Sequence, residues 1–67
     1  MKIFNNDTQK LIGEISSKED KDKLVKFVFG NFSWPEDMFD VEDNLIVDDY
    51  EEESLIREYC RKENIKL

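Results

Sequence analysis

The stretch of residues 35–54 constrains this chain most, because it holds ten carboxylates and no lysine or arginine. Like charges at this density repel one another, so most of these side chains must lie at the surface. The stretch contains one run of three apolar residues, Leu45–Val47, bounded on both sides by polar residues. We therefore predict a short buried strand at this run, with the acids on either side of it facing solvent.

The length of the chain allows one small domain, which spans residues 1–67. A chain of this length buries about 60% of the surface that its unfolded form exposes, so its core is small. Five phenylalanines, two tyrosines and one tryptophan offset this, since each aromatic side chain buries about 150–250 Å². With a net charge of −7, the sequence predicts a folded domain with an acidic surface.

The first sixteen residues predict a β-hairpin. The segments MKIFN and KLIGEIS flank NDTQ, and Asn and Asp favour turns because they tolerate left-handed backbone and bond their own backbone. In the hairpin, Leu11, Gly13 and Ile15 would share one face. A short helix over residues 8–16, capped by Asp7, fits the same apolar positions and is the alternative.

The next segment predicts a helix from about Lys18 to Phe29. Ser17 is a good N-cap, Asp20 stands at the capping-box position, and Gly30 offers a C-terminal stop. A short turn or helical turn is expected to open at Pro35, since proline suits the first helical position. The apolar residues recur at helical spacing: Leu24, Val25, Val28, Phe29 and Phe32.

A last helix is predicted over residues 50–64, capped by Asp48 or Asp49. It begins with acids and ends with cations, which matches the helix macrodipole. With the elements in the order β-β-α-β-α, the sequence predicts a small α+β domain whose helices pack on a short three-stranded sheet. The expected core stripe of this helix is Leu55, Ile56, Tyr59 and Cys60.

The residue types argue against an enzyme. The chain has no histidine, which excludes histidine-based triads and His/Cys zinc sites. It also lacks a glycine-rich phosphate loop and a serine elbow, so we expect no catalytic residues and no cofactor. Cys60 is the only cysteine and lies on the core stripe, where a free cysteine acts as a small hydrophobe.

The sequence shows no targeting or membrane signal. MKIFNNDTQK has no apolar core of the kind that a signal peptide needs, and the longest apolar runs are FVF and LIV. A membrane span needs about 18 or more apolar residues. We therefore expect a cytoplasmic protein that does not bind membranes.

Residues 40–51 resemble the calcium loop of an EF-hand. The loop geometry requires a glycine at the sixth position, and Leu45 occupies it. We therefore expect no metal site, and keep a degenerate EF-hand-like calcium site as a remote alternative. The residues at the positions that would supply ligands are Asp40, Glu42, Asn44, Asp48 and Glu51.

No cation occurs between Phe27 and Ile56, although the chain has ten lysines and arginines. A concentrated negative face suits a basic partner, because it steers association and rejects acidic competitors. Trp34 precedes Pro35 in this region and lies either at the edge of the core or at an interface as an anchor. The predicted partner-binding residues are Trp34, Glu36, Asp37, Asp40, Glu42, Asp43, Asp48, Asp49, Glu51, Glu52 and Glu53.

These features predict a small acidic protein that inhibits or neutralises a basic protein, either a nuclease or another nucleic-acid-binding protein. In size and charge the chain is similar to DNA-mimic anti-restriction and anti-CRISPR proteins of phages, and to some immunity proteins and antitoxins. Direct binding to nucleic acid is disfavoured because no basic stripe exists. The alternative is an accessory or regulatory subunit that docks through apolar surface and is acidic only for solubility.

Overall fold

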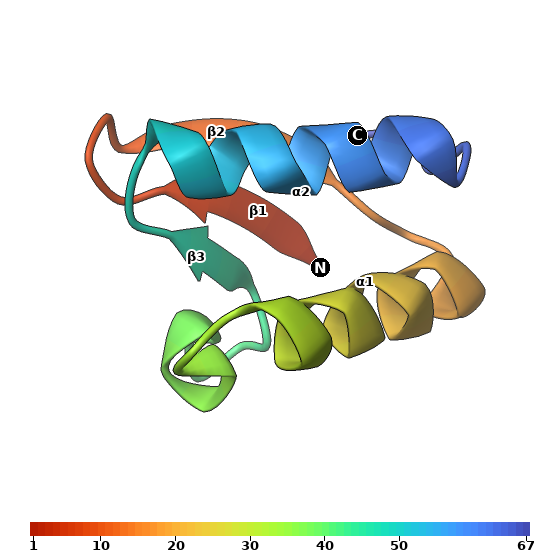
Figure 1. The fold of residues 1–67 in the computed structure, drawn as a ribbon, viewed down its shortest axis with the longest axis horizontal. Coiled ribbons are helices and arrows are strands. Elements are labelled where there is room, and N and C mark those ends of the chain that lie inside the picture. The colour runs from red at the N-terminus through yellow and green to blue at the C-terminus, as the bar shows by residue number, and fades with distance from the viewer.

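The chain forms the predicted α+β domain with elements in the order β-β-α-β-α, and a 3₁₀ turn precedes the third strand (Figure 1). The computed structural model describes residues 1–67. Its elements are β1 (Lys2–Asn5), β2 (Lys10–Glu14), α1 (Lys18–Asn31), η1 (Pro35–Met38), β3 (Leu45–Val47) and α2 (Tyr50–Lys62).

The sheet has the strand order β2-β1-β3, so the first strand of the chain is the central one. β1 pairs antiparallel with β2 and parallel with β3, where Ile3 lies opposite Leu45. The hairpin prediction is confirmed, and the alternative helix over residues 8–16 is wrong. Residues 6–9 form the turn, and Gln9 takes a left-handed φ of 63°.

A β-bulge places one side chain of the hairpin differently from the prediction. The register shifts between Ile3 and Phe4, so that Ile3 faces Gly13 while Phe4 faces Leu11. The bulge moves Leu11 to the face of the sheet that carries Phe4. Leu11 is consequently 54% exposed, and the prediction that it shares a face with the buried Ile15 is wrong.

The N-terminal cap of α1 is confirmed, because the Ser17 hydroxyl accepts a hydrogen bond from the Asp20 N–H at 3.3 Å. The predicted stop at Gly30 is wrong. Gly30 does not take a left-handed φ, and α1 continues through it to Asn31. The last helix, predicted over residues 50–64, begins at Tyr50 as expected and ends two residues earlier, at Lys62.

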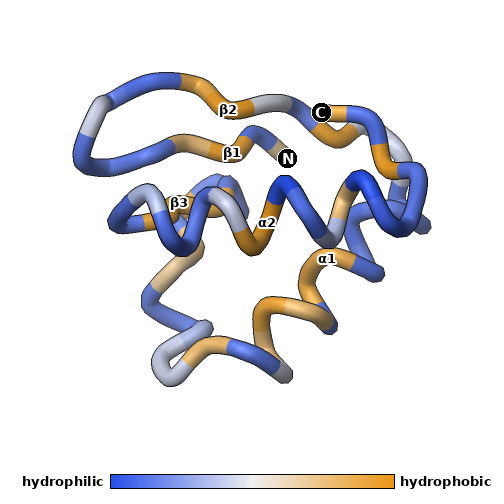
Figure 2. Tube along the Cα trace, turned by 45° about the horizontal axis from the view of Figure 1, so that its top comes forward, coloured by the Kyte–Doolittle hydropathy of each residue, from blue (hydrophilic) through white to orange (hydrophobic).

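The core is one cluster formed by the sheet and both helices (Figures 1 and 2). Three predicted core residues lie outside it: Phe29 is 51% exposed, Leu55 is 46% exposed, and the partly buried Val25 is not part of the cluster. The apolar stripe of each helix is wider than the surface that the other elements cover. The core residues are Ile3, Ile15, Leu24, Val28, Met38, Leu45, Val47, Ile56, Cys60 and Ile65.

The two helices also contact each other directly. The ring of Phe27 on α1 stacks on that of Tyr59 on α2, with centroids 4.2 Å apart. The Tyr59 hydroxyl donates a hydrogen bond to the Lys23 carbonyl at 3.2 Å.

Leu67 packs so closely on β2 that a Cβ on Gly13 would lie 2.5 Å from the Leu67 Cβ, so this strand position requires glycine. Neither helix combines the length and the apolar character that crossing a membrane demands.

Candidate binding face

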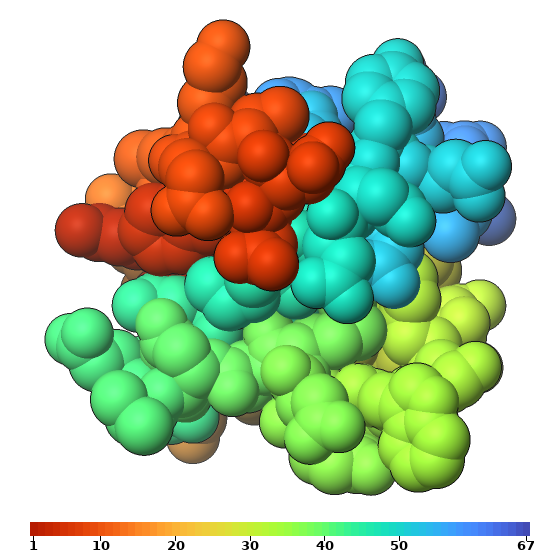
Figure 3. Space-filling view, turned by 90° about the vertical axis from the view of Figure 1, so that its left-hand side faces the viewer, coloured from red at the N-terminus to blue at the C-terminus, as the bar shows by residue number.

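The acid-rich residues 35–54, which we call the acidic segment, lie at one end of the molecule. β1 and β3 are parallel and both end there, so the hairpin turn lies near the start of α2. Figure 3 views this end: the acidic segment, coloured green to cyan, occupies much of the surface beside the hairpin turn in orange-red. The fold thus brings η1, the following turn and the start of α2 onto one face.

Asp40 stabilises the turn that precedes β3. Its Oδ1 accepts hydrogen bonds from the backbone N–H groups of Glu42 and Asn44, both at 2.8 Å. The backbone N–H of Asn44 is the largest cause that holds the pKa of Asp40 below its usual value. The turn closes at Asn44, and Leu45 then enters a strand opposite Ile3. Residues 40–51 are therefore a turn, a strand and a helix start rather than one continuous loop.

Asp49 and Glu52 close the N-terminus of α2. Asp49 Oδ1 accepts a hydrogen bond from the Glu52 N–H at 2.9 Å, so Asp49 is the cap, as one of the two predicted choices. Glu52 Oε1 in turn accepts one from the Asp48 N–H at 2.7 Å. The first bond satisfies a donor that the helix start leaves without a partner, and the second ties the residue before the cap to the first turn of the helix.

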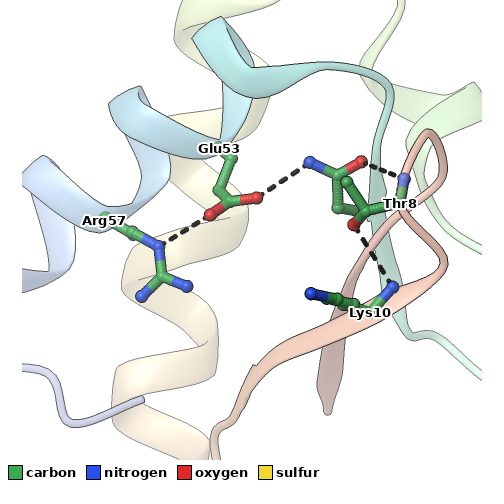
Figure 4. Close-up of polar contacts among 5 residues, drawn as sticks. Thr8, Lys10, Glu53 and Arg57 are labelled. Atoms are coloured by element: carbon green, nitrogen blue, oxygen red, sulfur yellow. Dashed lines mark hydrogen bonds and ion pairs between the residues drawn. The ribbon is translucent and has the colours of Figure 1, made fainter.

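Glu53 lies between a buried amide and an arginine (Figure 4). Its Oε1 accepts a hydrogen bond from Asn5 Nδ2 at 2.8 Å, and its Oε2 accepts one from Arg57 Nε at 2.9 Å. These two contacts, Asn5 first, hold the pKa of Glu53 below its usual value. Asn5 is 3% exposed, and its Oδ1 accepts hydrogen bonds from the Asp7 and Thr8 N–H groups in the hairpin turn.

The sequence analysis missed Asn5 and Arg57. A signal for Asn5 was present, because it follows Ile3 at a spacing of two and so lies on the buried face of its strand. A polar side chain on a buried strand face needs hydrogen-bond partners. Arg57 is four residues after Glu53 on α2, which is the spacing of a helical ion pair.

The other six carboxylates of the acidic segment have no such partners. All six are exposed, and no side-chain oxygen of theirs accepts a hydrogen bond within the chain. They are therefore the members of the predicted set that remain available to another molecule: Glu36, Asp37, Glu42, Asp43, Asp48 and Glu51.

A groove of about 380 Å³ lies between the end of α1, η1 and the start of α2. The side chains of Phe32, Met38 and Ile46 line it, and so does the indole of Trp34. Trp34 is 71% exposed, so its indole is not part of the core edge. The carboxylates that line the same groove are Asp37, Asp48 and Glu52.

The groove differs in charge from the other three hollows of the surface. Lys62 lines the hollow between α1 and α2, and Lys21 lines the one beside Phe29. Lys10 and Arg57 line the hollow at the hairpin. The groove at Trp34 is the one whose lining contains carboxylates and neither lysine nor arginine.

Cys60 lies in the core and is 1% exposed. Burial, with a smaller contribution from Asp20, raises the pKa of its thiol to about 11, so the thiol stays protonated at neutral pH.

The structure contains no group of three or more His, Cys, Asp or Glu side chains that could hold a metal ion. No protein-family model, curated protein or solved structure matches the chain.

Proposed function

We propose that this chain is a non-enzymatic inhibitor that binds a basic, nucleic-acid-handling protein through its acidic segment. The observation that carries the proposal is the set of six exposed carboxylates without intramolecular partners at one end of the fold. No lysine or arginine occurs between residues 27 and 56 to offset them. The proposal includes a location in the cytoplasm, where such partners act on nucleic acid.

The physical basis is competition with phosphate. Proteins that grip nucleic acid present lysine and arginine side chains to its backbone, and these contacts dominate their affinity. Carboxylates held on a folded scaffold satisfy the same cations and steer the encounter at long range. A basic surface occupied in this way is closed to nucleic acid, which makes the bound chain an inhibitor.

The test is capture of partners from a lysate of the encoding organism, with the native chain and two double variants as bait. Asp37→Lys with Asp48→Lys reverses two free carboxylates of the acidic segment. Glu14→Lys with Glu58→Lys is the control, since it changes the net charge equally at exposed positions outside that segment. Glu52 is left unchanged because its carboxylate accepts a hydrogen bond from the Asp48 N–H.

The proposal predicts that the native chain and the control capture a nucleic-acid-binding protein that the Asp37/Asp48 variant does not. The captured protein should be released by salt above physiological strength, where the Debye length falls below about 8 Å, and by added DNA or RNA. Capture that is equal for all three baits and insensitive to salt would refute the electrostatic mechanism.

A second candidate, an accessory subunit that docks through apolar surface, is favoured by one observation. Phe29 is 51% exposed and stacks on Phe39, with ring centroids 6.0 Å apart, beside a shallow hollow that Val25 also lines. Docking of this kind would survive high salt and would be lost in Phe29→Ser, while Asp37→Lys with Asp48→Lys would leave it intact.

A further inference from the structure

We infer that the groove at Trp34 is a subsite for one arginine side chain of the basic partner. This inference rests on the proposed function and narrows it, because it assigns the specific contact to one place on the acidic segment. The remaining free carboxylates then act at longer range, as steering charges.

The charge of the groove favours a cationic occupant. Asp37 and Asp48 contribute carboxylates that accept no hydrogen bond within the chain, and Glu52 uses only Oε1 for its cap. The other three hollows of the surface each include a lysine or arginine among their lining residues. A cation that enters the groove therefore meets carboxylates without a competing lysine or arginine in the lining.

The apolar part of the groove selects arginine over lysine. A guanidinium is flat and weakly hydrated, so it stacks on an aromatic face, and the indole of Trp34 is exposed beside the carboxylates. Its five N–H donors serve several carboxylates at once, whereas an ammonium acts as a compact, strongly hydrated charge. The side chains of Phe32, Met38 and Ile46 offer an apolar surface for the methylene stem.

The groove is large enough to take a side chain of a partner. Its volume of about 380 Å³ lies within the range of about 300–1,000 Å³ that is usual for ligand pockets. An aromatic residue beside a small hollow, surrounded by polar groups, is also the arrangement that interface hot spots favour.

The test uses two peptides of equal charge, hexa-arginine and hexa-lysine, titrated into the intact chain. Trp34 is the only tryptophan, so its fluorescence reports on the groove alone. The inference predicts that hexa-arginine binds several-fold tighter than hexa-lysine and changes the emission of Trp34 on binding. Calorimetry gives the affinities independently of the fluorescence.

Matched neutral variants locate the site. Asp37→Asn with Asp48→Asn removes two carboxylates of the groove and should weaken hexa-arginine binding about tenfold or more, because hydrogen bonds to charged groups are lost. Glu42→Gln with Glu51→Gln removes two exposed carboxylates that line none of the four hollows, and should weaken it less than about threefold. Trp34→Ala should weaken hexa-arginine binding, while Tyr50→Ala, at a residue 76% exposed outside the groove, should not.

Equal weakening by the two carboxylate pairs, or equal affinity for the two peptides, would overturn the arginine subsite. The proposed function would survive that result, since diffuse binding of basic peptides still fits an electrostatic inhibitor. Failure of the proposed function has a different signature, which is salt-insensitive capture of partners that does not depend on Asp37 or Asp48.

Discussion

The two flanks of α2 carry carboxylates from the same helical turn, yet they differ in how the charge is offset. On the flank toward the hairpin, Glu53 is bonded to Asn5 and Arg57. On the flank toward η1, Glu52 lines a groove with no cation. Adjacent residues on a helix point about 100° apart, so Glu52 and Glu53 meet different neighbours. The density of acids along a sequence therefore does not reveal which carboxylates are available to a partner.

The largest effect is expected from Ile56, which lies in the core and is 0% exposed. Ile56→Ala should lower the free energy of unfolding by about 2–5 kcal/mol and disturb both flanks, because it leaves a cavity under α2. Leu55→Ala, at a residue 46% exposed, should cost about 1 kcal/mol or less. Urea denaturation measures both, and equal losses would mean that α2 packs on a different face.

A smaller loss is expected at Asn5, which affects only the hairpin flank. Asn5→Ala should lower the free energy of unfolding by about 1–3 kcal/mol, since the Asp7 N–H, the Thr8 N–H and Glu53 lose their partner. The control is Asn31→Ala, which removes an exposed side-chain bond to the Phe27 carbonyl and should cost about 0.5 kcal/mol. A loss at Asn5 no larger than the control would contradict the role of the buried amide.

The hairpin flank should also make stability depend on pH. The pKa of Glu53 in the folded state is lowered, first by Asn5 and then by Arg57, so the ionised carboxylate stabilises the fold. This contribution is present above the usual glutamate value of 4.5 and is lost as the pH falls through the lower folded pKa. Glu53→Gln should therefore differ most from the native chain near neutral pH and converge with it in acid. Denaturation at pH 7 and in acid measures this difference in the free energy of unfolding. A difference between the variant and the native chain that is equal at both pH values would contradict this linkage.

The smallest effect on stability is expected on the groove flank. Asp37→Lys with Asp48→Lys should change the free energy of unfolding by no more than about 0.5 kcal/mol, because neither side chain has a partner to lose. The same variant should lose hexa-arginine binding, so function and stability separate on this flank. A substantial loss of thermal stability would show that these carboxylates have a structural role.

Local signals were enough to predict the order of the elements. Ser17, Pro35 and Asp49 each start a helical segment for a reason contained in a few residues. The apolar run Leu45–Val47 was recognisable as a strand because it is short and polar residues, Asn44 and Asp48, bound it. The residues NDTQ favoured the hairpin turn, but the apolar spacing left a short helix over residues 8–16 as an alternative that the pairing of β1 with β2 excludes.

The errors arose where distant residues decide. The exposure of Leu11 follows from the bulge in the pairing of β1 with β2, and the sequence of β2 alone does not predict that bulge. Phe29 and Leu55 fit a helical stripe but lie beyond the surface that the rest of the fold covers. The groove was not predictable for the same reason, since Trp34 precedes η1 while Ile46 and Asp48 lie in and just after β3, and these segments meet only through packing.

The central place of β1 has a consequence for the order of folding events. The hairpin closes over a short loop, but a lone two-stranded hairpin is marginal in water. Completion of the sheet needs β1 to meet β3, and the hydrogen bond from the Lys2 N–H to Asn44 Oδ1 spans a sequence separation of 42. Closing so long a loop carries an entropic cost before contacts repay it, so we expect the pairing of β1 with β3 to limit the rate of folding. Ile46 and Asp48 lie in and just after β3, so the groove that they line depends on this long-range pairing.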